Sequence, residues 1–213
     1  MAEPITQRTP RDRTLDAASA VFAASGFGGS RVDEIAARAG VNKAMLYYHV
    51  GDKRALYTAV LMRNFDRVQA AVEEALTLSG SARLRLEAVI TALTKVVREH
   101  PDHPRIVLRE IVSGAVHLPP EALARMLEVV GVVRGLLAEG TAAGEFRRLD
   151  PVLTHLGIVG AIIFLNATAP IRERAAELGP GFDIPEPTTD VAAFLNAMLL
   201  DGIAVPPKKG VHP

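Results

Sequence analysis

Apolar residues recur at intervals of three and four along most of this 213-residue chain, and this spacing constrains its fold more than any other feature. It is the spacing of one face of an α-helix, and no alternating run of β-branched residues is long enough to form a strand. In the first segment, Leu15, Ala18 and Phe22 share one face of a helix that Gly26 should end. The sequence therefore predicts an all-α protein.

Glycine, proline and capping residues divide the chain into about nine expected helices. Ser30, Asn42 and Asp52 are the expected N-caps of the second, third and fourth helices. The expected helices cover residues 11–25, 32–39, 43–49, 53–76, 82–99, 105–116, 121–143, 151–169 and 189–204.

Composition limits the chemistry open to the chain. The absence of Cys excludes thiol catalysis, thiolate zinc sites and disulfides. The 24 basic and 24 acidic side chains balance, so charge alone does not indicate nucleic-acid binding. The first 30 residues carry too many charges for a secretory signal, and we expect a cytoplasmic location.

One segment, residues 151–171, carries no formal charge and is about as long as a membrane span. Thr154, His155 and Asn166 interrupt it, and no other segment is comparably apolar. We interpret it as a helix buried in a protein interface and expect no membrane partner.

Residues 35 to 46 have the spacing of a helix-turn-helix. Ala36 is small where two crossing helices approach, and Gly40 tolerates positive φ in the turn between them. Ile35, Val41 and Leu46 would form the small core that fixes the pair. In such a pair the second helix enters the major groove of DNA.

If Leu46 faces inward, Lys43, Ala44, Tyr47 and Tyr48 face outward or lie on the rim. Tyrosine hydroxyls and lysine ammonium groups can donate to phosphate oxygens, the contacts that position a protein on a duplex. Spacing alone leaves a second interpretation open, in which the pair is plain architecture and both tyrosines are buried.

The same stretch resembles the DNA-binding domain of the tetracycline-repressor (TetR) family of transcriptional regulators. The resemblance covers about residues 11–62 and rests on three runs, VDEIA at 32–36, AGVNK at 39–43 and LYYHVGDKRAL at 46–56. It implies a homodimer whose recognition helices read two half-sites of a pseudo-palindromic operator, roughly 34–36 Å apart or a multiple of that. It also implies a small-molecule effector that lowers operator affinity.

The family pattern assigns roles to seven residues, of which Lys43, Ala44, Met45, Tyr48 and His49 would lie at base edges, and Tyr47 and Lys53 on phosphates. Lys53 would act together with the backbone N–H groups of its helix. Met45 and Val50 depart from the pattern, because Thr or Ser and Phe are usual there. A Met can touch a thymine methyl, so the operator sequence of relatives cannot be carried over.

The resemblance implies four parts: a flexible arm at 1–10, a DNA-binding domain at 11–57 with its helix-turn-helix at 31–50, a larger helical ligand-binding and dimerisation domain at 58–205, and a disordered tail at 206–213. Beyond about residue 62 the likeness is one of architecture.

Two late helices, at 151–169 and 189–204, look like the pair that forms a four-helix bundle across the dimer axis. The expected interface residues are Leu153, Leu156, Gly157, Gly160, Ile163 and Phe164. The two glycines would let partner helices approach closely, although packing within one subunit explains them equally well.

An effector pocket would lie among the fourth to eighth expected helices and be mostly apolar with a few polar anchors. The candidates by position are Thr94, His100, His103, Arg109, His117 and Asn166. Alternatively, the first two histidines are solvated and Arg109 pairs with Glu110. The only closely spaced histidines flank a proline, so we expect no metal and no cofactor.

Three classes of function fit this pattern. The first is a ligand-responsive DNA-binding regulator, usually a repressor, which needs no catalytic residue. The second is a helical adaptor that acts through protein partners, which would differ in having little salt dependence. The third, an all-α enzyme, is disfavoured because the glycine-rich turn at 26–29 follows a helix rather than a strand, and no nucleophile elbow is present.

Overall fold

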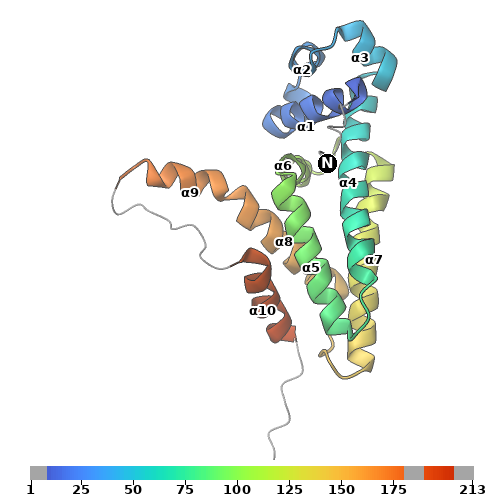
Figure 1. The fold of residues 1–213 in the computed structure, drawn as a ribbon, viewed down its shortest axis with the longest axis vertical. Coiled ribbons are helices and arrows are strands. Elements are labelled where there is room, and N and C mark those ends of the chain that lie inside the picture. Colours follow the sequence, from blue (N-terminus) through green and yellow to red (C-terminus); the bar gives the residue numbers. More distant parts are fainter. Residues whose placement is uncertain (1–8, 180–189, 204–213) are drawn as a thin grey trace, which may run out of the picture. The chain divides into compact units, whose positions relative to one another are not determined.

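The computed structural model describes residues 9–179 and 190–203. These residues form ten α-helices and no β-strand (Figure 1), which confirms the all-α prediction. The helices are α1 (Pro10–Gly29), α2 (Val32–Ala39), α3 (Lys43–Val50), α4 (Lys53–Leu76), α5 (Ala82–Glu99), α6 (Asp102–Val112), α7 (Pro120–Ala142), α8 (Pro151–Ala167), α9 (Ala169–Ala176) and α10 (Val191–Ile203). The short α9 was not expected, and the predicted tail lies outside the described residues.

Two of the three expected N-caps are confirmed. The side chains of Asn42 and Asp52 each accept a hydrogen bond from the backbone N–H three residues later, at 2.7 and 2.8 Å. The prediction for Ser30 is wrong, because its hydroxyl donates to the carbonyl of Phe27 and α2 begins after Arg31 without a side-chain cap. Capping therefore fixes α3 and α4, the helices that carry the expected DNA contacts.

The sixth helix lies a few residues earlier than expected. It begins at Asp102 because Pro104 falls in its first turn, where proline is tolerated. It ends at Val112 because Gly114, the residue after the C-cap Ser113, adopts a φ of 77°, a left-handed conformation that does not continue a right-handed helix.

The chain divides into two compact units. Unit 1 comprises residues up to Asp66 together with His100–Arg125, and unit 2 comprises Arg67–Glu99 and the residues from Met126 onward. Two of the three boundaries fall inside α4 and α7, so each of these helices contributes to both units, and the third lies between α5 and α6.

Unit 1 is built around α1, which packs against α2, α3 and α6. Its buried side chains include Phe22, Ile35, Leu46 and Ile106. Tyr57 is also buried, with its ring edge-on to that of Phe22 at 4.8 Å between centroids. These contacts give α2 and α3 a rigid base.

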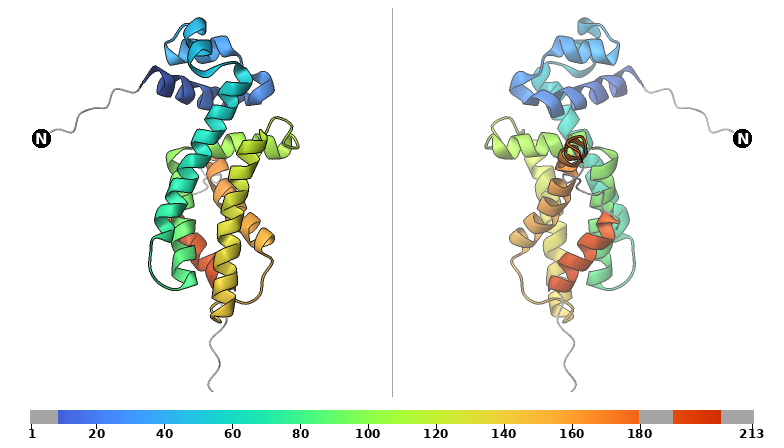
Figure 2. Two further views of the ribbon diagram at one scale, coloured as in Figure 1. Left: turned by 90° about the vertical axis from the view of Figure 1, so that its right-hand side faces the viewer. Right: turned by 90° about the vertical axis from the view of Figure 1, so that its left-hand side faces the viewer.

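Unit 2 has a core of aliphatic side chains from α5, α7, α8 and α10, among them Val89, Ile90, Val133, Ile162 and Leu195. The right-hand view of Figure 2 shows α8 in orange and α10 in red, and α10 packs on both α5 and α8.

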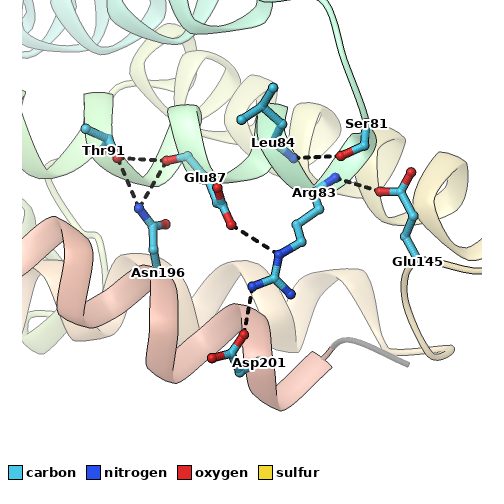
Figure 3. Close-up of polar contacts among 8 residues, drawn as sticks. All are labelled: Ser81, Arg83, Leu84, Glu87, Thr91, Glu145, Asn196 and Asp201. Carbon is cyan, nitrogen blue, oxygen red and sulfur yellow. Dashed lines mark hydrogen bonds and ion pairs between the residues drawn. The ribbon is translucent and has the colours of Figure 1, made fainter. Parts of the chain in front are cut away.

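Polar contacts join α10 to α5 in unit 2 (Figure 3). The Arg83 guanidinium donates to Glu87 and to Asp201 at 3.2 and 2.7 Å, and its backbone N–H donates to Glu145. About two helical turns further along α5, the Asn196 amide donates to Thr91 Oγ1 at 3.1 Å. The angle between the two helices is thus fixed at two points.

Candidate nucleic-acid interface

The turn between α2 and α3 has the geometry that the sequence predicts for a helix-turn-helix. Gly40 adopts φ 65° and ψ 35°, a left-handed conformation that favours glycine. The Val41 N–H donates across the turn to the carbonyl of Ala36 at 3.1 Å. This closed turn ends α2 at Ala39 and lets α3 begin at Lys43, after three intervening residues.

The inward face of the pair is packed as expected. Ile35, Ala36 and Leu46 are buried, and Val41 is half-buried beside the turn. Leu46 is the one fully buried side chain of α3, so it fixes the rotation of that helix and determines which residues point outward.

The outward face of α3 carries the residues expected to contact DNA. Tyr48 is 86% exposed and Tyr47 is 42% exposed, so the interpretation in which both are buried in a core is wrong. The other exposed members are Lys43, Ala44, Met45 and His49. Figure 1 shows α2 and α3 beside each other with α1 packed beneath them. The face is basic and aromatic.

Lys43 is held by an ion pair at the start of α3. Its Nζ lies 2.8 Å from Asp33 Oδ1 on α2. The hydrogen bond and the opposite charge raise the pKa of Lys43 and lower the pKa of Asp33. A carboxylate therefore sits on the surface that would meet DNA.

Lys53 is fixed at the first residue of α4. Its Nζ donates to the carbonyl of Ser30 at 2.6 Å and lies 4.8 Å from the centre of the Phe27 ring. An ammonium group has three donors, so the bond to Ser30 does not exhaust its capacity to donate to a phosphate. The side chain is half-buried, which restricts it to one position.

The structure separates the six residues expected in an effector pocket. Thr94 and Asn166 line one cavity of about 380 Å³ in unit 2. Arg109 and His117 line another, of about 510 Å³, in unit 1. His103 is buried with its ring edge-on to Phe65, and His100 is half-buried and lines neither cavity.

Arg109 and Glu110 have separate partners, contrary to the alternative in which they pair. The Arg109 guanidinium donates to the carbonyls of Ala23 and Ala24 near the end of α1. Buried Glu110 accepts from the Tyr57 hydroxyl at 2.5 Å, and burial raises the pKa of that hydroxyl. These two residues tie α6 to α1 and α4 within unit 1.

Four further residues that line the unit 2 cavity were not predicted from the sequence, namely Thr91, Lys95, Arg98 and Arg172. The first three lie on one face of α5 together with Thr94, at spacings of three, four and seven residues. That spacing was a detectable signal, whereas the approach of Arg172 from α9 depends on the tertiary fold.

Most of the expected dimer-interface residues are exposed on α8. Leu153, Leu156 and Phe164 are 69%, 58% and 68% exposed. A Cβ at Gly157 or Gly160 would meet nothing within 4 Å among the described residues, so packing within one subunit does not explain these glycines. Ile163 differs, because it is buried inside the subunit.

One further property of α8 bears on its surroundings. With α9 it forms a segment, Pro151–Ala175, that is long and apolar enough to cross a membrane by length and composition.

No candidate metal site is present in the part of the chain that the structure describes, because it holds no group of three His, Cys, Asp or Glu side chains that could bind an ion.

A capped, exposed second helix behind a closed turn is the geometry of a helix-turn-helix, the motif whose second helix enters the major groove in DNA-binding proteins. Residues 15–60 match the model of the bacterial regulatory proteins of the tetR family, and residues 79–166 match the tetracyclin repressor-like C-terminal domain. The chain is 30% identical to the HTH-type transcriptional activator FasR of Mycolicibacterium smegmatis, over 81% of each chain. It is 33% identical to the HTH-type transcriptional repressor NicS of Pseudomonas putida, over 74% of this chain and 76% of the relative. The chain belongs to the tetR family.

Solved structures share the fold. A bacterial regulatory protein in the tetR family from Rhodococcus RHA1 superposes with a TM-score of 0.72 at 24% identity, over 92% of this chain and 98% of the other. The ketosteroid transcriptional regulator KstR2 of Mycobacterium tuberculosis gives 0.65 at 20% identity, over 93% and 96%. The protein is thus a DNA-binding transcriptional regulator and not an enzyme.

Proposed function

We propose that the protein is a ligand-responsive repressor that binds a pseudo-palindromic operator as a homodimer and is released by a small-molecule effector. The observation that carries the proposal is the exposed basic and aromatic face of α3 above the buried Leu46. In this proposal residues 11–57 form the DNA-binding domain, and residues 58–205 bind the effector and dimerise. Because the protein would bind DNA, we propose a cytoplasmic location.

The proposed division of labour on DNA is the one that the family resemblance implies, and the exposure of these side chains on α3 supports it. The base edges are assigned to the outward residues Lys43, Ala44, Met45, Tyr48 and His49. Phosphates are assigned to Tyr47 and to Lys53, whose ammonium group is already fixed by Ser30. Phosphate contacts release counterions, so binding should weaken steeply as salt rises.

The homodimer is proposed from the apolar surface of α8 and α10. Phe164 and Leu153 on α8, with Phe194 and Met198 on α10, are at least half exposed. Soluble monomers rarely leave so many large apolar side chains together in water. A second copy that covers this face would also account for the long apolar segment without a membrane.

Repression is proposed because NicS, the relative with the higher identity of the two, is named a repressor. FasR is named an activator, so the direction of regulation needs its own measurement. A reporter gene behind the selected operator gives it: addition of the protein should lower expression, and a rise would overturn repression while leaving DNA binding intact.

The central experiment selects bound duplexes from a random-sequence pool at physiological salt, with the full chain. The expected result is an enriched inverted repeat, because specific sites bind about 10³-fold or more tighter than random DNA. The variant Tyr48→Ala should lose or change the enriched sequence, while Arg134→Gln, an exposed residue of α7 in unit 2, should preserve it. A folded dimer that enriches nothing would contradict the proposal and favour the adaptor.

A further inference from the structure

The cavity of unit 2 combines exposed cationic side chains with aliphatic ones. It lies where α5, the junction of α8 and α9, and the start of α10 meet, and its volume is about 380 Å³. Ligand sites of small molecules occupy about 300–1,000 Å³. Of the residues that the structure describes, three cationic side chains, Lys95, Arg98 and Arg172, and one carboxylate, Asp190, line it.

The one carboxylate is already engaged. Asp190 Oδ1 accepts from the Ala193 N–H at 2.9 Å and so caps the start of α10. Within the described residues, neither Lys95 nor Arg98 has an acidic partner. Among the residues that the structure describes, three cations therefore line the cavity with one carboxylate, an excess of two positive charges.

Arg172 is held in place before any ligand arrives. Its Nη1 donates to the carbonyl of Leu165 and to Thr168 Oγ1, at 3.3 and 3.0 Å. Its Nε is buried and has no hydrogen-bond partner. A guanidinium fixed in this way loses little freedom when it binds a planar carboxylate.

The rest of the lining suits a small apolar body with polar anchors. Leu165, Val191 and Ala192 supply aliphatic surface. Thr94 and Asn166 each donate to a backbone carbonyl of their own helix, so their oxygens stay available as acceptors. The position of Arg98 in the last turn of α5 also suits the helix dipole, but that explanation does not extend to Lys95 or Arg172.

We propose that this cavity binds a small organic carboxylate with an apolar body, its charge held by Arg172 with Lys95 and Arg98. The inference rests on the proposed function in taking this ligand as the effector. Binding would act on α10, because Thr91 of the lining accepts from Asn196 of that helix (Figure 3).

The test measures binding of charged and neutral probes of the same shape to the full chain by calorimetry. The probes are 2-naphthoate and octanoate, each compared with its neutral amide, and inorganic phosphate. The affinity of each carboxylate should be at least about tenfold higher than that of its amide, because only the carboxylates form charge-assisted hydrogen bonds. Equal binding of acid and amide, binding of phosphate alone, or no saturable binding of either carboxylate would overturn the proposal.

Variants locate the binding. Arg172→Gln, and separately the double variant Lys95→Gln with Arg98→Gln, should each weaken carboxylate binding about tenfold. The double variant changes exposed residues and so should fold even if the single variant does not. Arg134→Gln removes the same charge elsewhere in unit 2 and should bind as the unchanged protein does. If carboxylate affinity is unaffected in both cavity variants, the site is wrong.

The outcome is independent of DNA binding. If an operator is enriched but no carboxylate binds, the proposed DNA-binding function stays supported and the proposed carboxylate site is refuted. Carboxylate binding without an enriched operator would establish the site and refute the proposed function.

Discussion

The recognition helix and the unit 2 cavity are assembled in opposite ways. Residues 31–50 supply the whole of the helix-turn-helix, and its turn, cap and buried leucine lie between Gly40 and Leu46. The cavity takes its lining from positions as far apart as Thr91 and Ala192. A site made of neighbours in sequence is specified by local chemistry, whereas a distributed site depends on how helices pack.

The two sites also hold their cations differently. Lys43 and Lys53 each have a partner close by, an aspartate in one case and a backbone carbonyl in the other. In the cavity, Arg172 is fixed by a carbonyl and a hydroxyl oxygen, which are neutral acceptors. On a surface that binds a polyanion such as DNA, individual cations can be paired with neighbouring groups. A small pocket needs an excess of positive charge to attract a single anion.

The largest expected effect tests whether Leu46 alone fixes the recognition helix. Leu46→Ala should destabilise the protein by about 2–5 kcal/mol, because it opens a cavity under α3. Its exposed neighbour serves as the control, since Met45→Ala should change stability by no more than about 0.5 kcal/mol. Urea unfolding followed by circular dichroism measures both. Equal losses would show that the helix is not held by this contact.

The next effect separates phosphate contacts from base contacts on α3 and α4. Lys53→Ala should weaken binding to all duplexes about equally and reduce the salt slope by about 1, whereas Tyr48→Ala should change which sequence is preferred. Titration of specific and random duplexes at several salt concentrations distinguishes them. The assignment of roles fails if both variants affect specific and random DNA alike.

A pH-dependent effect belongs to unit 2. His155 is 6% exposed, and burial lowers its pKa below the usual value near 6.5. The unfolded chain therefore takes up a proton more readily than the folded one, so this stability is fully present above pH 6.5 and is lost as pH falls below it. Thermal unfolding between pH 7.5 and 5.5 should show a drop that His155→Leu reduces.

The control for this effect is the exposed His49→Gln, which should keep the full drop in unfolding temperature. An unchanged pH dependence in His155→Leu would mean that another group is responsible.

The smallest effect concerns the carboxylate on the DNA-facing surface. Asp33→Asn removes a negative charge and frees Lys43, so affinity for specific and random duplexes should rise about two- to fivefold at low salt. Carboxylate binding in unit 2 should not change. A fall in DNA affinity would instead show that Asp33 positions Lys43 for its contact.

Much of unit 1 could be predicted because its signals are local. Asn42 and Asp52 were identified as caps and Gly40 as the turn from residue type alone, and the structure confirms all three. Ser30 was misassigned because a serine before a helix can also donate backward, here to the carbonyl of Phe27. Local competition of this kind depends on where the preceding helix ends.

The six residues expected in an effector pocket do not lie together, because position along the chain does not determine which residues are close in space. Thr94 and Asn166 do share a cavity, but His103 and Arg109 lie in the other unit and have structural partners. The cationic residues that define the cavity were missed, since Lys95 and Arg98 look like an ordinary solvated face of α5.

By itself, the sequence determined the helical fold, the position of the helix-turn-helix and the residues that α3 turns outward, because each depends on the 3.6-residue period and on capping within a few residues. Only the tertiary structure decided that Arg172 meets the α5 cations beside the start of α10, and that Asp33 pairs with Lys43. Contacts between helices follow from packing geometry, which the order of residues along one helix does not contain.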